Sequence, residues 1–244
     1  MIALIKDSNI EYLKKYYNKD NIKDAIKRLN AGEPVQYIVG NVDFYGYELD
    51  VNKNVLIPRR ETEELVEEVI KRSKNFNNPT LIDVGTGSGA IAISLSKELN
   101  CHIYASDISG AALKVAKKNI CKTSSNVTLY KGNMLKPYIK NDIKVDILVS
   151  NPPYIDKTEK IEDIVKNNEP HLALYAKNKG LEFYESILKD VSKILNDKFL
   201  IAFEIGQEQG EMVKKIALKY LSNIKVEIKK DLSLKNRFVF VYNF

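Results

Sequence analysis

Leu81-Ile82-Asp83-Val84-Gly85-Thr86-Gly87-Ser88-Gly89-Ala90-Ile91 is the stretch that decides the fold of this 244-residue chain. Its first residues predict a buried strand, and those after Gly89 predict a helix. Glycines in the turn between them let the backbone approach a ligand with no Cβ in the way. The GxGxG spacing after an acid excludes a P-loop and disfavours, without excluding, a dinucleotide fold. Candidate ligand contacts in this stretch are Asp83, Gly85, Thr86, Gly87, Ser88 and Gly89.

Alternating strand and helix patterns follow this stretch along the chain. Further strands are predicted at 103–106, 127–130, 145–149, 199–204, 225–229 and 238–242, after a first one at 80–84. Helices are predicted at 90–98, 110–119, 180–195 and 207–220. Such alternation predicts a doubly wound, mostly parallel α/β sheet whose ligands bind at the carboxyl ends of the strands. The last two strands are close in sequence, which favours an antiparallel pair at the sheet edge.

The strand after the glycine turn ends in Asp107-Ile108-Ser109. An acid at that place can accept hydrogen bonds from ribose hydroxyls, and Ser109 is a good N-cap for the next helix. Glycine turn and acid together predict a nucleoside-type cofactor. They do not separate S-adenosylmethionine from NAD, and a structural turn with a surface aspartate is the alternative without a ligand.

Asn151-Pro152-Pro153-Tyr154 lies where the strand predicted at 145–149 ends, beside the glycine turn in a doubly wound sheet. Proline fixes its own φ and restricts its predecessor, so Asn151 and Pro152 are held stiffly. The Asn151 side-chain oxygen and the Pro152 carbonyl can therefore converge on one planar NH2 group, with Tyr154 covering its face. A Pro-Pro turn with a packed tyrosine is the structural alternative. The pattern favours methyl transfer to an amide or amino nitrogen, with residues 151–154 as the catalytic set.

The region before residue 80 predicts helices and a small extended unit. Apolar residues at helical spacing predict helix over the first ~30 residues, ending at Gly32 and Pro34. Residues 35–55 predict an extended hairpin or β-arm, because glycines punctuate them. Acids in the first turn and bases in the last predict a helix at Glu61–Arg72. Residues 155–179 carry no clear element, so we interpret them as a candidate lid over the site.

Composition excludes several classes of protein. The chain has 44% apolar and 29% charged residues, which is ordinary for a globular protein. Its net charge is +6, but 33 of the 38 basic residues are lysines spread along the chain, which favours a solvated surface over a nucleic-acid face. Its apolar runs fall short of the ~20 residues that span a bilayer, and no export signal is recognised. Two cysteines without CxxC spacing and two isolated histidines predict no metal site and a cytoplasmic protein.

The ordered motifs of residues 32–242 resemble the protein-glutamine N5-methyltransferases of the HemK type, which modify peptide chain release factors. The matching segments are 32–40, 44–46, 55–59, 61–63, 83–91, 107–109, 150–155, 169–174, 180–181 and 204–207. NPPY alone also marks adenine methyltransferases, whereas the ordered set is specific. The resemblance implies a class I methyltransferase fold, Rossmann-like, with an antiparallel C-terminal edge strand. It also implies an N-terminal helical segment (1–31), a linker and β-hairpin (32–60) and a catalytic domain (61–244).

The resemblance also implies how the site is used. Gly85–Gly89, Asp107, Ile108, Asn133, Met134 and Asn151 would hold S-adenosylmethionine, which leaves as S-adenosylhomocysteine. Residues 151–154 would bind the glutamine of the release factor's Gly-Gly-Gln loop, and Phe44, Arg59 and Glu61 are further candidate substrate contacts. The chain departs from the family pattern at Asn133, usually an acid, and at Arg60, usually a proline. Its helical region before Gly32 is also shorter than the family's multi-helix domain.

Other functions of two kinds, enzymatic and non-catalytic, remain open on these residues. One is an adenine-N6 methyltransferase acting on a flipped DNA or RNA base, or a methyltransferase of another protein glutamine, such as that of a ribosomal protein. The other is a non-catalytic module that binds S-adenosylmethionine. Since no target-recognition domain or basic-aromatic strip is recognised, the sequence favours a protein substrate, no direct need for nucleic acid or membrane, and a monomer.

Overall fold

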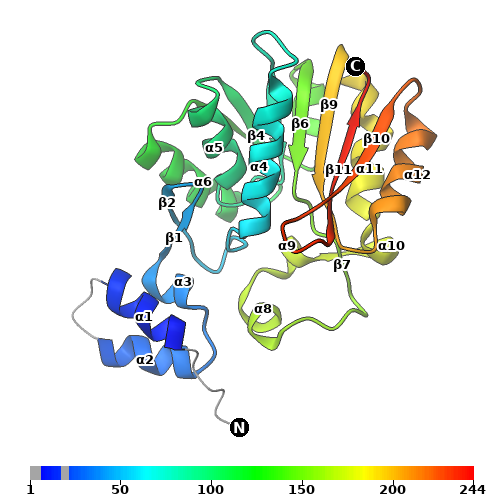
Figure 1. The fold of residues 1–244 in the computed structure, drawn as a ribbon. Coiled ribbons are helices and arrows are strands. Elements are labelled where there is room, and N and C mark those ends of the chain that lie inside the picture. The colour runs from blue at the N-terminus through cyan, green and yellow to red at the C-terminus, as the bar shows by residue number, and fades with distance from the viewer. Residues whose placement is uncertain (1–6, 18–21) are drawn as a thin grey trace.

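The computed structural model describes residues 7–17 and 22–244. Among them, seven strands form one sheet in the order β10-β11-β9-β6-β3-β4-β5 (Figure 1). The four strands β3, β4, β5 and β6 are parallel to one another, and β9 is parallel to β6. β11 pairs antiparallel with both β9 and β10. The predicted doubly wound sheet with an antiparallel edge is confirmed.

The sheet strands begin and end within a few residues of their predicted bounds. They are β3 (Leu81–Val84), β4 (Ile103–Asp107), β5 (Val127–Lys131), β6 (Val145–Ser150), β9 (Leu195–Glu204), β10 (Lys225–Lys230) and β11 (Asn236–Tyr242). The order reverses between β3 and β6, because successive strands are added on opposite sides of this pair. Crevices at such a reversal, outside the carboxyl ends of the strands, are where doubly wound proteins bind ligands.

The helices around the sheet follow the prediction in most places. They are α4 (Arg60–Ser73), α5 (Ala90–Glu98), α6 (Gly110–Thr123), α7 (Lys136–Lys140), α11 (Glu182–Asp190) and α12 (Gly210–Tyr220). The helix predicted at 180–195 is shorter than expected. Gly180 has a left-handed φ of +81°, the chain tightens into a 3-10 turn at Val191–Lys193, and Leu195 already belongs to β9.

Two apolar clusters cover the two faces of the sheet. Along β9, Leu200 and Ala202 belong to one cluster, and Ile201 and Phe203 belong to the other. Because successive side chains of a strand point to opposite faces, the two clusters lie on opposite sides. The first cluster contains apolar residues of α4, α5 and α6, and the second contains those of α11 and α12. Each helix layer therefore buries one face of the strands that carry the site.

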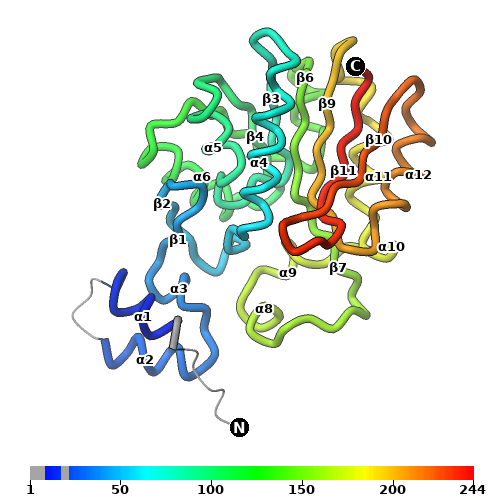
Figure 2. Tube along the Cα trace, viewed as in Figure 1, coloured from blue at the N-terminus to red at the C-terminus, as the bar shows by residue number. Residues whose placement is uncertain are grey.

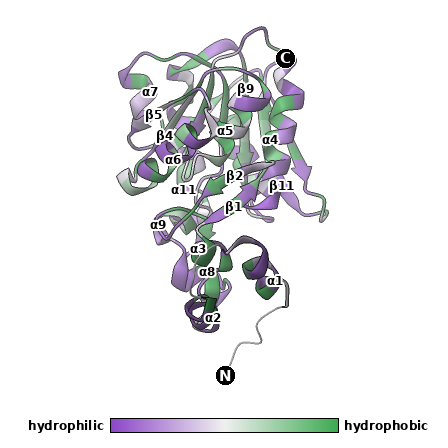
Figure 3. Ribbon diagram, turned by 90° about the vertical axis from the view of Figure 1, so that its left-hand side faces the viewer, coloured by the Kyte–Doolittle hydropathy of each residue, from purple (hydrophilic) through white to green (hydrophobic). Residues whose placement is uncertain are grey.

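The N-terminal part forms a separate small cluster of helices, α1 (Asp7–Tyr16), α2 (Ile22–Asn30) and α3 (Val35–Val39). The prediction of an extended segment from residue 35 is wrong, because Val35 and Ile38 pack onto Leu13 and Leu29 in a helix. Gly40 ends this helix with a left-handed φ of +97°. The chain trace and the side view show these helices below the β1–β2 hairpin (Figures 2 and 3). Residues 1–6 and 18–21 of the predicted helical region lie outside the described residues.

The predicted β-arm is the hairpin of β1 (Asn41–Phe44) and β2 (Tyr47–Asp50). Its apolar residues Phe44 and Leu49 join the cluster under α4 and α5, so it belongs to the core of the larger unit. Buried Asn119 of α6 also holds it. The Asn119 side chain accepts from the Asp50 backbone N–H at 2.7 Å and donates to the carbonyls of Asp50 (3.0 Å) and Ser88 (2.9 Å). The hairpin and the glycine turn are thereby fixed to the same helix.

Residues 155–180 are more ordered than their sequence indicates. They contain the paired strands β7 (Ile155–Asp156) and β8 (Tyr175–Ala176), the short helices α8 (Asp163–Asn168) and α9 (His171–Leu174), and a turn, α10 (Lys177–Gly180). The Asn168 side chain donates to the Gly32 carbonyl at 2.9 Å, which joins α8 to the N-terminal helices. No helix in the described part of the chain is long and apolar enough to cross a membrane.

Candidate active site

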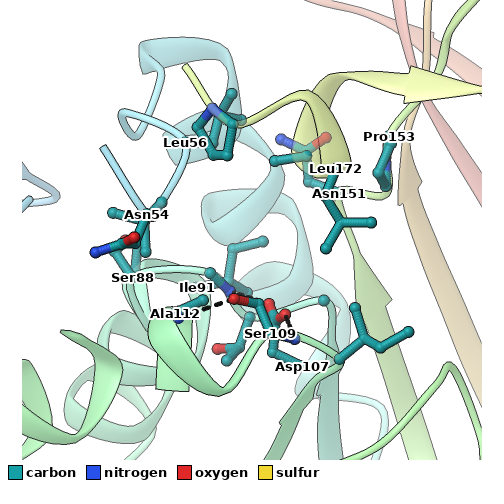
Figure 4. A pocket seen from close by; sticks show the side chains of 18 of the residues that line it. Asn54, Leu56, Ser88, Ile91, Asp107, Ser109, Ala112, Asn151, Pro153 and Leu172 are labelled. Atoms are coloured by element: carbon teal, nitrogen blue, oxygen red, sulfur yellow. Dashed lines mark hydrogen bonds between the residues drawn. The ribbon is translucent and has the colours of Figure 1, made fainter. Parts of the chain in front are cut away.

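A pocket opens to solvent at the carboxyl ends of β3, β4, β5 and β6, and its empty space, open solvent included, is about 1090 Å³. Asp107 and Ser109 lie on one wall and Asn151 and Pro153 on the other (Figure 4). The predicted site residues that line it are Arg59, Gly85, Thr86, Gly87, Ser88, Asp107, Ile108, Asn133, Met134, Asn151 and Pro153.

The glycine turn presents bare backbone to this cavity. The N–H groups of Gly85 and Thr86 both donate to the Ser106 carbonyl at 2.9 Å, which holds the start of the turn. Gly85 and Gly87 have left-handed φ values of +79° and +56°. A Cβ at either glycine would meet no atom within 4 Å, so open space lies directly beside their backbone. That space fits a ligand that approaches the backbone closely.

Asp83 and Gly89 lie behind the cavity wall. Asp83 is fully buried and accepts a hydrogen bond from the Thr86 hydroxyl at 2.6 Å, while burial raises the pKa of its carboxyl to about 7. A Cβ on Gly89, the N-cap of α5, would lie 3.2 Å from the Ile93 side chain and 3.5 Å from Ala116. Both residues therefore support the conformation of the glycine turn and do not line the cavity.

Asp107 lies at the end of β4, on the cavity wall. Its carboxylate accepts from the Gly87 backbone N–H at 2.9 Å and from the Ser109 N–H at 2.8 Å. Burial raises the pKa of the Asp107 carboxyl, and the hydrogen bonds from the backbone only partly offset this rise. Each carboxylate oxygen keeps a further lone pair for a ligand hydroxyl. Asp107 therefore links the glycine turn to the start of α6 and remains able to accept from a ribose.

The turn after β5 forms the adjoining wall with Asn133 and Met134. The Gly132 N–H donates to the Asp107 carbonyl at 3.0 Å, which draws this turn toward the end of β4. A Cβ on Gly132 would lie 2.3 Å from Cγ of Pro137. Only glycine fits there without moving Pro137, the second residue of α7. The turn places the neutral Asn133 side chain at the cavity.

Residues 151–154 leave β6 on the opposite wall. Asn151 and Pro153 line the cavity, whereas Pro152 is buried and Tyr154 is not part of the lining. The Tyr154 hydroxyl lies 3.5 Å from Oε1 of Glu204, and its carbonyl accepts from the Gln209 side chain at 2.8 Å. Burial raises the pKa of the Tyr154 phenol strongly. The interpretation that Tyr154 covers the substrate amide stays a prediction, since here its ring packs behind the loop.

The three candidate substrate contacts lie in different places. Phe44 is 1% exposed and packs in the core away from the cavity wall. Arg59 lines the cavity and forms an ion pair with Glu169, a buried carboxylate that also accepts from the Ile57 N–H at 3.0 Å. Glu61 is in the first turn of α4 and outside the lining. Arg59 is thus the one of the three that the fold brings to the cavity.

The sequence does not single out several cavity residues as site residues, although most of them lie in segments that match the family pattern. Thr62, in the first turn of α4, lines the cavity, and its hydroxyl donates to the buried Glu204 carboxylate at 2.6 Å. Glu204 lies in a matching segment of the family pattern, but a single strand-end acid does not reveal its partner. Apolar lining comes from separate segments that only the fold brings together: Leu56, Pro58, Leu172, Ala173 and Phe183.

In the described part of the chain, no group of three or more histidines, cysteines or acids is arranged to hold a metal ion. His102 pairs through Nε2 with the Thr128 hydroxyl at 2.8 Å, and His171 with the Lys166 carbonyl at 2.9 Å. Both cysteines are free.

The fold and this cavity define the class of protein, a methyltransferase of the class I fold. Residues 61–174 match the family described as "Methyltransferase small domain". A solved methyltransferase from Pyrococcus furiosus has the same fold, with a TM-score of 0.60 and 17% identity, over 92% of this chain and 99% of that one.

Curated relatives identify the family within this class. A release factor glutamine methyltransferase from Bacillus subtilis is 43% identical over 88% of this chain and 77% of its own length. One from Staphylococcus aureus is 41% identical over 88% of this chain and 78% of its own. The chain belongs to the release factor glutamine methyltransferase family, as the resemblance of its ordered motifs predicts.

Proposed function

We propose that this protein transfers a methyl group from S-adenosylmethionine to the side-chain amide nitrogen of a glutamine, that of the Gly-Gly-Gln loop of peptide chain release factors. One observation carries the proposal. Asn151, held by two following prolines, lies on the cavity wall opposite the glycine turn and Asp107. An amide acceptor thus faces a cofactor-sized space in a chain of this family.

The residues present fit the cofactor. Bare backbone at Gly85 and Gly87 leaves room for a close ligand, Asp107 offers carboxylate lone pairs to ribose hydroxyls, and Asn133 Oδ1 can accept from an adenine amino group. S-adenosylmethionine, when bound, supplies an electrophilic methyl group on a sulfonium and leaves as S-adenosylhomocysteine. Because asparagine is neutral, Asn133 would accept the hydrogen bond of the adenine amino group without the negative charge that an acid would bring.

Asn151 and Pro152 carry the proposed chemistry on the protein side. A glutamine amide nitrogen is barely nucleophilic, because its lone pair is delocalised into the carbonyl. When Oδ1 of Asn151 and the Pro152 carbonyl accept its two N–H hydrogens, the face of that nitrogen is fixed and positive charge growing on it is stabilised. Positioning of this kind supplies about 7–11 kcal/mol of barrier reduction in favourable cases. A strong base is unnecessary, since the methylated nitrogen loses its proton readily.

Apolar lining residues protect this step from water. Leu56, Leu172 and Phe183 lie on the cavity wall with Pro153. A substrate side chain that fills the remaining space excludes water, which strengthens the hydrogen bonds to the amide. The Arg59–Glu169 pair holds the segment carrying Leu172 against the chain before α4.

We assign three parts to the chain: residues 1–31 as the N-terminal helical region, 32–60 as linker and hairpin, and 61–244 as the catalytic domain. The separate apolar cluster of α1, α2 and α3 supports the first boundary, although α3 itself falls in the linker. The hairpin packs with the catalytic domain, which supports treating it as a rigid extension of that domain.

The partner in this proposal is the release factor itself. The proposal takes the enzyme to work as a monomer, with the cavity lined by residues of this chain. The proposal requires no nucleic acid and places the enzyme in the cytoplasm, where release factors act on the ribosome. Analytical sedimentation of the protein alone measures its oligomeric state, and sedimentation with the release factor measures the stoichiometry of their complex.

The experiment uses purified protein, labelled S-adenosylmethionine and a release factor carrying either Gln or Ala in its Gly-Gly-Gln loop. Label on the Gln form alone is the expected result. DNA, RNA and ribosomal protein are offered in parallel reactions. Label on one of these, with none on the release factor, contradicts the proposal.

A further inference from the structure

Asn151 has to present a particular end of its amide to the cavity. The proposed function, on which this inference rests, needs the oxygen there, because a substrate NH2 can only donate. The two ends of an asparagine amide are almost the same size, so packing alone does not choose between them. A directional hydrogen-bond partner is required.

The Asn151 amide nitrogen is held by the hydroxyl of Thr62. Nδ2 donates to this hydroxyl at 3.1 Å, and the Asn151 side chain also lowers the pKa of the nearby Glu204 carboxyl. The Thr62 hydroxyl in turn donates to Oε2 of Glu204 at 2.6 Å. Thr62 is 5% exposed and Glu204 is 2% exposed, so water does not substitute for either partner.

The direction of this chain of hydrogen bonds follows from donor counts. Above pH 7 the Glu204 carboxyl, whose pKa is about 7, is ionised and only accepts, and a hydroxyl has a single hydrogen. Once the Thr62 hydrogen points at Glu204, Thr62 can only accept from Asn151. The NH2 end of the amide must therefore face Thr62, which turns Oδ1 toward the cavity.

We propose that Thr62 and Glu204 are positioning residues for methyl transfer, which orient the Asn151 amide so that its oxygen receives the substrate NH2. Glu204 lies at the end of β9 beside β6, where Phe203 pairs in register with Ser150. Thr62 lies in the first turn of α4. Three separate elements, β6, β9 and α4, thus meet to fix one amide.

Replacement of Thr62 or Glu204 removes the hydrogen bonds that set the orientation of the Asn151 amide. In Thr62→Val the methyl group has nearly the same shape as the hydroxyl but cannot accept. In Glu204→Gln the new NH2 group can donate to Thr62, which then donates to Oδ1 of Asn151 and turns the amide around. Thr62→Ser keeps the hydroxyl. Ser73→Ala is the matched control, because Ser73 is a buried hydroxyl of the same helix that bonds only the Ile70 carbonyl at 2.8 Å.

The test is run at pH 8, where Glu204 is ionised, and measures kcat and KM for the release factor, the Kd of S-adenosylmethionine and the melting temperature of each variant. We expect Thr62→Val to lower kcat about a hundredfold, the size that misplacement of a reacting group produces. Its Kd for S-adenosylmethionine stays within about twofold, and Thr62→Ser and Ser73→Ala keep kcat within about threefold. Full kcat in Thr62→Val, or a parallel loss of cofactor binding and kcat, overturns the proposal.

A second measurement needs no substrate. The side-chain NH2 resonance of Asn151, assigned by its absence in Asn151→Asp, exchanges slowly with solvent in the wild type and in Thr62→Ser. It exchanges fast in Glu204→Gln, where the NH2 faces the cavity, and this variant decides the question if Thr62→Val does not fold. Equal exchange rates in the wild type, Thr62→Ser and Glu204→Gln refute the proposal that Thr62 and Glu204 orient the Asn151 amide. A wild type that leaves the release factor unmethylated, yet shows slow exchange, instead contradicts the proposed function alone.

Discussion

Replacement of Glu204 by Gln is expected to stabilise the folded protein at neutral pH. Burial is the main reason that the pKa of this carboxyl rises from its ordinary 4.5 to about 7, and nearby Glu61 raises it further. Hydrogen bonds from Thr62 and Asn151 and the positive charge of Arg237 oppose the rise. The ionised carboxylate is therefore less favourable in the folded protein than in the unfolded chain. A neutral glutamine of the same shape avoids that cost.

The size and sign of the effect follow from proton linkage. Between pH 4.5 and 7 the unfolded chain has released this proton while the folded protein retains it, so stability falls as pH rises through that window. With pKa values of 4.5 and about 7, the loss between pH 5 and pH 8 is about 2–3 kcal/mol. The Gln variant lacks this loss. Its advantage over the wild type thus grows by about 2–3 kcal/mol across the same range.

Urea denaturation of both proteins at pH 5, 6, 7 and 8 measures the difference in unfolding free energy. The pH dependence of Asp83, whose pKa is also about 7, is common to both proteins and cancels in the difference. If the difference in unfolding free energy between Glu204→Gln and the wild type is constant from pH 5 to 8, or shrinks as pH rises, then Glu204 does not have a raised pKa in the folded protein. The same variant is expected to lose kcat, so stability and activity move in opposite directions.

Three further variants test the parts around the cavity. Gly85→Ala and Gly46→Ala impose the same left-handed strain, with φ values of +79° and +78° and open space around each Cβ, so both cost about 1–2 kcal/mol in denaturation. Only Gly85→Ala is expected to weaken S-adenosylmethionine binding by calorimetry, because Gly46 lies in the hairpin turn; equal affinities contradict the assigned cofactor loop. Gly180→Ala places a Cβ 2.0 Å from the Tyr154 carbonyl, so we expect about 2–5 kcal/mol of destabilisation and a lower kcat, and an unchanged melting curve opposes this. Glu169→Ala removes the partner of Arg59 and of the Ile57 N–H, so we expect it to lower the free energy of unfolding in urea by about 1–3 kcal/mol and to speed proteolysis within residues 157–174. Proteolysis as slow as in the wild type would show that Glu169 does not hold this segment in place.

The glycine turn and residues 151–154 are predictable from sequence because their constraints are local. Left-handed φ values at Gly85 and Gly87 require glycine, and the prolines after Asn151 stiffen their own backbone. The strand and helix patterns on either side give the order of elements along the chain. Those features therefore place the cofactor loop and the reactive loop at the carboxyl ends of parallel strands.

Features that depend on tertiary contacts are not visible in the sequence. Helix α3 is rich in β-branched residues, and its helical form follows from packing of Val35 and Ile38 onto other helices. The hydrogen bond between Thr62 and Glu204 joins residues 142 apart in sequence. Phe44 fits the family pattern of the hairpin, but only the fold shows that its side chain points into the core.

Single-turnover methyl transfer with Asn151→Ala tests whether the Asn151 amide orients the substrate nitrogen. The variant is first saturated with S-adenosylmethionine, as shown by calorimetry, and then mixed with excess release factor. We expect cofactor affinity within about threefold of the wild type and a transfer rate at least about a hundredfold lower. Transfer at the wild-type rate by the saturated variant would show that this amide does not orient the substrate.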